Sequence, residues 1–145
     1  MKFLKSIFSV KYNSNLLNMW MFVLRILIGI FILTHGFPKF QTLISGAEIH
    51  FADPIGLGVK ASFALVVFAE FFCAILLILG LFTRLATIPL IISMAVASFF
   101  AHAGDTFADK ELSLLYLILF VTFMISGGGK YSLDNLIYSG LLRKK

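Results

Sequence analysis

The amino-acid sequence predicts an all-α integral membrane protein, and three observations support this prediction. The chain has 145 residues, of which 60% are hydrophobic and only 13% are charged. Its mean hydropathy is +1.00. The apolar residues form long continuous runs, whereas the strands of a membrane β-barrel alternate apolar and polar residues. Lipid must therefore surround much of the chain, and helices satisfy their own backbone hydrogen bonds there.

Four apolar runs predict a four-helix bundle that forms a single transmembrane domain over residues 1–145. A bilayer core about 30 Å thick is crossed by about 20 helical residues. The predicted spans cover about residues 16–35, 61–82, 85–102 and 111–127. We expect the first span to end within "THGFPK", because Gly36 allows the left-handed conformation that ends helices and Pro38 prevents the helix from resuming.

Basic residues predict the orientation of the bundle, because they concentrate on the cytoplasmic side of membrane proteins. Three lie in connections on one side of the predicted bundle, Lys39, Lys60 and Lys110, and eight lie on the other side, Lys2, Lys5, Lys11, Arg84, Lys130, Arg143, Lys144 and Lys145. Both termini are therefore expected to be cytoplasmic. The N-terminal segment "KFLKSIFSVK" and the C-terminal segment "YSLDNLIYSGLLRKK" have apolar residues at helical spacing, which predicts amphipathic helices in the membrane interface.

The basic net charge of +5 is explained by this topology, and no nucleic-acid partner is expected. The expected partners are the lipid bilayer and either other membrane-protein subunits or further copies of this chain. The single cysteine, Cys73, excludes a disulfide framework, a Cys-x-x-Cys redox motif and a thiolate zinc site within the chain.

Two charged residues, Arg25 and Glu70, fall inside predicted spans, where an unpaired charge costs at least a few kcal/mol. Counting from the span ends places their backbones at depths that differ by about 7 Å. The side chain of Arg25 is long enough to cover that distance, so an intramembrane ion pair between them is expected. Such a pair either clamps two helices together or takes part in binding a polar headgroup or relaying a proton.

Four polar residues near the outer ends of the spans form a second candidate group, which we predict to bind a ligand: His35, Lys39, His102 and Glu111. Taken singly, a histidine at a helix C-terminus or a glutamate in a first turn favours the helix dipole and needs no ligand. The residue types suit zinc or iron, but their spacing matches no local metal motif, and no metal is predicted. A quinone or small-anion pocket needs the same groups.

The order of these motifs resembles that of the DoxX family of small bacterial membrane proteins. The resemblance extends from about Arg25 to Asp134 and includes "THGFPK", "LGLFTRLA", "KELSLLYL" and "GGGKYSLD". It implies four transmembrane helices in the bacterial inner membrane and an association with redox enzymes. The positions that match the family pattern are Arg25, His35, Gly36, Lys39, Glu70, Gly80, Arg84, His102, Glu111 and Asp134.

The expected function is that of a multi-pass inner-membrane protein that serves as a small subunit or partner of a redox complex. Its outer polar cluster would contact a quinone or a small anion, and quinone is the only candidate cofactor. The sequence does not decide whether the chain is itself an enzyme. The alternative is a non-catalytic structural or assembly subunit whose polar residues only hold helices together. Four short spans without an interrupted-helix repeat argue against a transporter.

Overall fold

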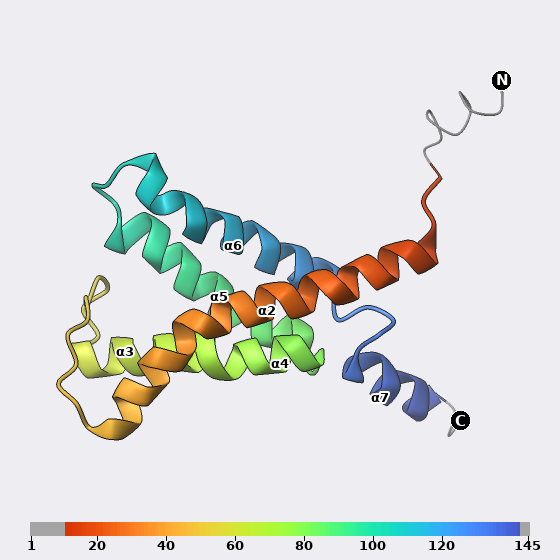
Figure 1. Ribbon diagram of the computed structural model, residues 1–145, viewed down its shortest axis with the longest axis horizontal. Helices are drawn as coiled ribbons and strands as arrows, with labels where there is room; N and C mark the ends of the chain where they lie inside the picture. The colour runs from red at the N-terminus through yellow and green to blue at the C-terminus, as the bar shows by residue number, and fades with distance from the viewer. Residues whose placement is uncertain (1–10, 143–145) are drawn as a thin grey trace.

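The computed structural model describes residues 11–142, and every regular element in that range is a helix. The all-α prediction is therefore confirmed (Figure 1). Six of the elements are α-helices and two, η1 and η2, are π-helices. Their bounds are α2 Ser14–Ser45, α3 Val59–Val67, η1 Phe68–Cys73, α4 Ala74–Leu79, α5 Thr83–Val96, η2 Ala97–Ala101, α6 Phe107–Ser126 and α7 Leu133–Leu142. The predicted N-terminal amphipathic helix falls on residues outside the described range.

Among residues 11–142, three helical rods are long and apolar enough to cross a membrane. They are α2, the continuous rod α3–η1–α4 over Val59–Leu79, and the rod α5–η2 over Thr83–Ala101. The fourth predicted span corresponds to α6, which has 20 residues but carries Asp109, Lys110 and Glu111 near its start. The protein is thus an all-helical membrane protein, and its predicted C-terminal helix is present as α7.

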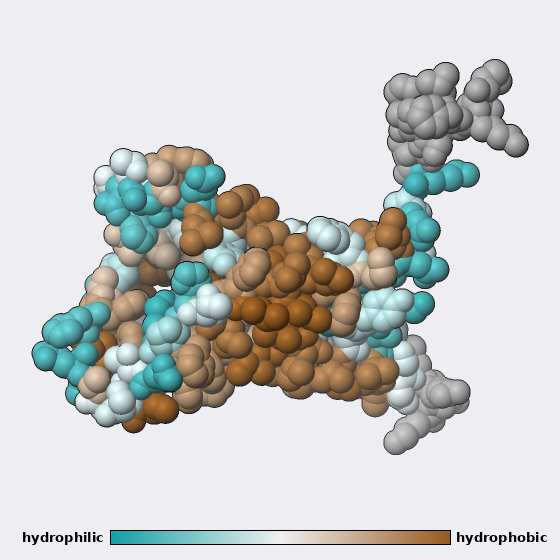
Figure 2. All heavy atoms as spheres, viewed as in Figure 1, coloured by the Kyte–Doolittle hydropathy of each residue, from teal (hydrophilic) through white to brown (hydrophobic). Residues whose placement is uncertain are grey.

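The surface of the molecule has the polarity profile of a chain embedded in lipid. Figure 2 shows apolar residues in a band across the middle of the rods and hydrophilic residues at the two ends. One end carries the segments 46–58 and 102–106 and is called the loop end here. The other carries the start of α2, the turn 80–82 and α7, and is called the terminal end (Figure 1). The apolar side chains exposed on the band therefore contact the bilayer.

Helix α2 extends ten residues beyond the predicted end of the first span, and the expected stop at Gly36 and Pro38 is wrong. The side chain of Asn13 caps its start by accepting hydrogen bonds from two backbone N–H groups, and Gly46 ends it with φ of 68°. Pro38 lies inside the helix, which bends in its second half (Figure 1). Membrane helices tolerate proline because neighbouring groups compensate for the backbone hydrogen bond that it removes.

The core lies where the four rods meet. Each rod contributes fully buried apolar side chains, among them Ile32 from α2, Ala74 from α4, Leu90 from α5 and Phe120 from α6. The most extensive packing joins α5 to α6. This packing fixes the rods rigidly enough to hold polar side chains at defined positions between them.

At the terminal end, polar contacts around the buried Arg25 side chain join the C-terminal segment to the bundle. We call this group the terminal lock: Arg25, Gly80, Gly128, Tyr131 and Asp134. Arg25 is fully buried and donates hydrogen bonds to the carbonyl oxygens of Gly128 and Tyr131. The Asp134 carboxylate accepts hydrogen bonds from the backbone N–H groups of Phe82 and Thr83, at 2.7 and 2.9 Å. These contacts cap the start of α5 with a side chain from the other end of the chain.

Candidate functional site

A buried ion pair joins the bent second half of α2 to η1. Lys39 Nζ lies 2.5 Å from Glu70 Oε2 and donates a hydrogen bond to it. The Glu70 side chain is only 6% exposed, whereas that of Lys39 is 30% exposed. Ser93 Oγ on α5 lies 3.5 Å from the other carboxylate oxygen, Oε1. Helices α2 and α5 therefore each place a polar group beside the carboxylate of Glu70.

The approach of α2 to η1 depends on Gly36. This glycine is buried, and a Cβ atom at its position would collide with the backbone carbonyl group of Glu70. Lys39 follows Gly36 by three residues and so lies on the same side of α2. Gly36 is thus a close-packing residue and not the helix terminator that we expected. Glu70 itself lies in a π-helical turn, a local geometry that occurs frequently at functional sites.

The predicted ion pair between Arg25 and Glu70 is corrected by the structure, because each residue has a different partner. Arg25 donates to carbonyl groups of the terminal lock, and Glu70 pairs with Lys39. The error came from the position assumed for the end of the first helix. Because α2 continues to Ser45, Lys39 lies within the helix at the level of Glu70, about 21 Å along the axis from Arg25.

Two cavities meet at the Lys39–Glu70 pair. The larger has a volume of about 710 Å³ and the smaller about 140 Å³, and Lys39, Glu70 and Ala97 line both. The larger cavity lies among α3, η1, α5, η2 and the segment 50–55, and its walls are mostly apolar. Its size is within the range of small-molecule sites, which are typically apolar with a few fixed polar groups. The larger cavity therefore has the size and the lining of a small-molecule site, with one charged pair at its wall.

The structure places Lys39 between two residues of the predicted outer cluster, because Lys39 shares one cavity with His35 and the other with His102, and it leaves out Glu111. His35 and Lys39 both line the smaller cavity, where His35 packs edge-on against Tyr116 with ring centroids 6.4 Å apart. His102 lines the larger cavity. Glu111 is exposed and lines neither of the two cavities.

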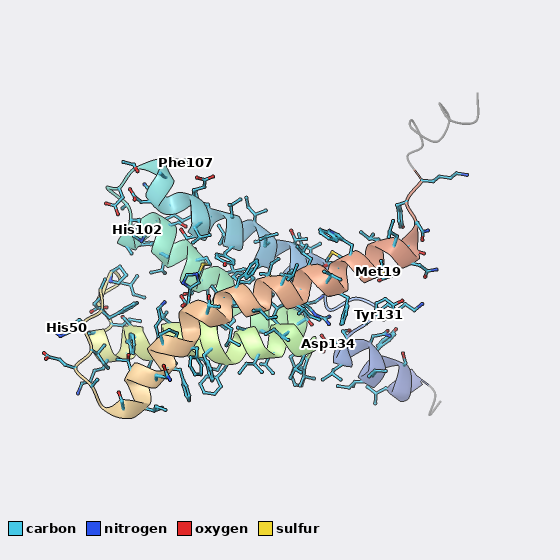
Figure 3. All side chains as sticks on the ribbon, viewed as in Figure 1. Met19, His50, His102, Phe107, Tyr131 and Asp134 are labelled. Atoms are coloured by element: carbon cyan, nitrogen blue, oxygen red, sulfur yellow. The ribbon has the colours of Figure 1, made fainter. Side chains whose placement is uncertain are left out.

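His102 lies at the loop end and has a carboxylate neighbour. Its Nδ1 lies 2.7 Å from Asp105 Oδ2. Figure 3 shows His102 and His50 at the same end of the molecule, and both line the larger cavity. Within residues 11–142, no three histidine, cysteine, aspartate or glutamate side chains are grouped so that they could hold a metal ion.

The sequence analysis did not identify the segment 50–55 as part of the site, although it forms a wall of the larger cavity. Asp53 holds this segment against the start of α3 by accepting hydrogen bonds from the Ser62 hydroxyl, at 2.7 Å, and from two backbone N–H groups. The Ser62 hydrogen bond is the main reason that the pKa of Asp53 lies below its usual value. Because the pKa of Asp53 is lowered in the folded protein, its contacts contribute their full stability at pH values above the normal carboxyl pKa. That contribution is lost as the pH falls through the lowered pKa.

We predict that Lys39 and Glu70 are energetically coupled and that Arg25 and Glu70 are not. In a double-mutant cycle, the Lys39→Met and Glu70→Met changes should show a coupling energy between about 0.5 and 3 kcal/mol, as residues in contact do. The same cycle with Arg25→Met and Glu70→Met should be additive within about 0.5 kcal/mol. The measurement is the free energy of unfolding in detergent. Additivity of the first pair would contradict the observed geometry.

The fold and the site together define a helical membrane protein with a polar pair enclosed between its spans. The chain belongs to the DoxX family, whose family model matches residues 20–103. This region contains Arg25, Lys39, Glu70 and His102 but ends before Glu111. The chain is also similar to an uncharacterised protein of Haemophilus influenzae, with 38% identity over 122 residues that cover 77% of this chain and 86% of the relative. No solved structure is significantly similar to it.

Proposed function

We propose that this protein binds the headgroup of a membrane quinone at the Lys39–Glu70 pair and serves as a small subunit or partner of a redox complex. The observation that carries the proposal is the larger cavity, which combines apolar walls with one ion pair. A quinone ring is apolar and flat, and its two carbonyl oxygens accept hydrogen bonds. The Lys39 ammonium and the hydroxyl of Ser93 are donors at the cavity wall, and His102 is a further polar group near the loop end.

The charge of the site favours a neutral headgroup over a small anion. Glu70 neutralises Lys39 at a distance of 2.5 Å, so the pair as a whole has no net charge. An anion placed beside Lys39 would also meet the carboxylate of Glu70, whose repulsion is strong in a water-poor site. Of the two ligand classes that the sequence suggested, quinone therefore fits the structure better.

The proposal includes a location and a topology. We place the protein in the bacterial inner membrane with α6 as its fourth span and both ends of the chain in the cytoplasm. The excess of basic residues at one side supports this orientation. The start of α2 and helix α7 lie at the same end of the molecule, as an even number of spans requires (Figure 1). The cavity then opens toward the periplasmic half of the membrane.

The alternative is a structural or assembly subunit in which Lys39 and Glu70 only fasten α2 to η1. That function requires the ion pair but has no use for a cavity of about 710 Å³ beside it. Unfilled space next to a buried pair removes packing contacts and so destabilises the bundle. The cavity therefore favours ligand binding over a purely structural role.

The test is the binding of a short-tailed benzoquinone to the purified protein in detergent. Lys39→Met should weaken binding at least tenfold, because it removes the charged donor at the cavity wall. Lys60→Met is the matched control, since Lys60 is an exposed lysine at the same end of the molecule that does not line the cavity. It should bind as the unaltered protein does.

A second variant separates loss of binding from loss of folding. Lys39→Met together with Glu70→Met replaces the pair with apolar side chains, a change that often preserves or increases stability. This double variant should remain folded and yet bind the quinone poorly. Binding of the quinone by the folded double variant with unchanged affinity would refute the proposed site. Failure of the unaltered protein to bind any quinone would favour the structural role.

A further inference from the structure

We propose that the larger cavity is entered from the lipid bilayer, between the rod α3–η1 and the rod α5–η2, and that its ligand is an amphiphile whose tail remains in that opening. This inference rests on the proposed function and specifies the ligand class further. The head of the ligand would lie at Lys39, Glu70 and Ser93. The tail would leave between Leu65 and Phe68 on one side and Ile92 on the other.

The lining residues show where the cavity reaches the lipid-facing surface of the protein. Leu65, Phe68 and Ile92 line the cavity and yet are 54, 49 and 57% exposed. A side chain that is at once a cavity wall and half-exposed lies at a mouth of the cavity. All three belong to rods with the length and composition of membrane spans, away from their ends. The mouth that they form therefore faces lipid.

The packing of the rods explains why an opening exists at this place. Helix α5 packs against η1, α4 and α6, whereas α3 packs chiefly against α2 and η1. The two rods are thus held together at η1 and separate toward the loop end, where α3 and η2 lie apart in Figure 1. The apolar walls of the cavity lie on either side of this separation.

The loop end of the cavity is bordered by polar and loop residues. The segment 50–55 forms its wall there, and Asp53 ties that segment to Ser62 at the start of α3. His50 and His102 also line the cavity there with side chains that are 82 and 44% exposed, so this end forms a second, polar mouth. A tailed molecule dissolved in the bilayer meets the apolar mouth instead. The polar groups of the cavity, Lys39, Glu70 and Ser93, then provide the contacts for a polar head.

The tail of the ligand would lie in the apolar mouth, where its surroundings resemble those in lipid. Lipid chains are about as apolar as leucine side chains, so a tail gains little free energy by moving from lipid to the mouth. The tail should therefore have little effect on affinity in the unaltered protein. A bulky side chain in the mouth should instead exclude tailed ligands selectively, because only they must occupy that space.

The experiment compares two probes with the same benzoquinone head, one with a decyl chain and one with a methyl group in its place. Both are titrated onto the full chain in lipid nanodiscs. Ile92→Trp and Leu65→Trp should weaken binding of the decyl probe at least tenfold and change binding of the methyl probe less than threefold. The matched control is Ile118→Trp, because Ile118 is 63% exposed on α6 and lines neither of the two cavities.

The outcomes separate this inference from the proposed function. If both probes bind the unaltered protein and the decyl probe binds Ile92→Trp and Leu65→Trp equally well, entry through this mouth is refuted while the headgroup site stands. Equal losses for both probes would also refute it, since the tryptophan would then obstruct the head and not a tail path. If neither probe binds the unaltered protein, the proposed function fails and this inference fails with it.

Discussion

Replacing Arg25 with leucine is expected to lower the free energy of unfolding by about 2–6 kcal/mol, the largest effect that we predict for a single substitution. The side chain is fully buried and donates to the carbonyl oxygens of Gly128 and Tyr131. A buried group that loses its hydrogen-bond partner costs about 1–3 kcal/mol, and this change affects the buried carbonyl of Gly128 and the partly buried carbonyl of Tyr131. The measurement is thermal or denaturant unfolding of the purified protein in detergent.

Two further variants control this prediction. Arg25→Lys should recover little of the loss, because a single ammonium group does not reproduce the planar fork that reaches two carbonyl groups. Arg84→Leu should change stability by less than about 1 kcal/mol, because Arg84 is exposed and donates to the Ile125 carbonyl at 3.2 Å. Equal effects of Arg25→Leu and Arg84→Leu would show that the terminal lock contributes nothing specific.

Replacing Gly36 with alanine is expected to destabilise the protein by about 1–3 kcal/mol, the usual range for overpacking a well-packed interior. The direction of this change in stability is informative, because alanine normally stabilises the interior of a helix relative to glycine by up to about 1 kcal/mol. Here the added methyl group would collide with the backbone carbonyl of Glu70, so that α2 must move away from η1. The same movement should separate Lys39 from Glu70 and weaken quinone binding.

Gly140→Ala is the matched control for this change. Gly140 lies in α7, and a Cβ atom there would meet no heavy atom within 4 Å. The substitution should leave stability unchanged or raise it slightly, according to helix propensity alone. If Gly36→Ala behaved in the same way, the close approach of α2 to η1 would be wrong, and with it the geometry of the ion pair.

The helices could be predicted from the sequence because long apolar runs leave the backbone no other way to satisfy its hydrogen bonds in lipid. The end of α2 could not be predicted in the same way. Gly36 and Pro38 have the local character of a stop, but the apolar residues after them, such as Phe40 and Ile44, remain helical until Gly46. Tertiary packing of Gly36 against Glu70 outweighed its local preference.

The candidate site was predicted only in part, for a related reason. Lys39 and Glu70 were each recognised, but as members of different groups, because the depth of Lys39 was counted from a wrong helix end. The π-helical turn around Glu70 leaves no signal in the hydrophobic pattern, since it depends on contacts with other rods. Glu111 was grouped by depth alone, and depth does not determine which side of a helix faces a cavity.

The capping of α5 by Asp134 has a consequence for the order in which the protein is made. Phe82 adopts the left-handed backbone conformation, with φ of 49°, which is unfavourable for a residue with a side chain. The carboxylate that satisfies the N–H groups of this turn comes from a residue synthesised about fifty positions later, after all four rods. All four rods must therefore be synthesised before this turn acquires its cap, so the last contacts of the bundle form late.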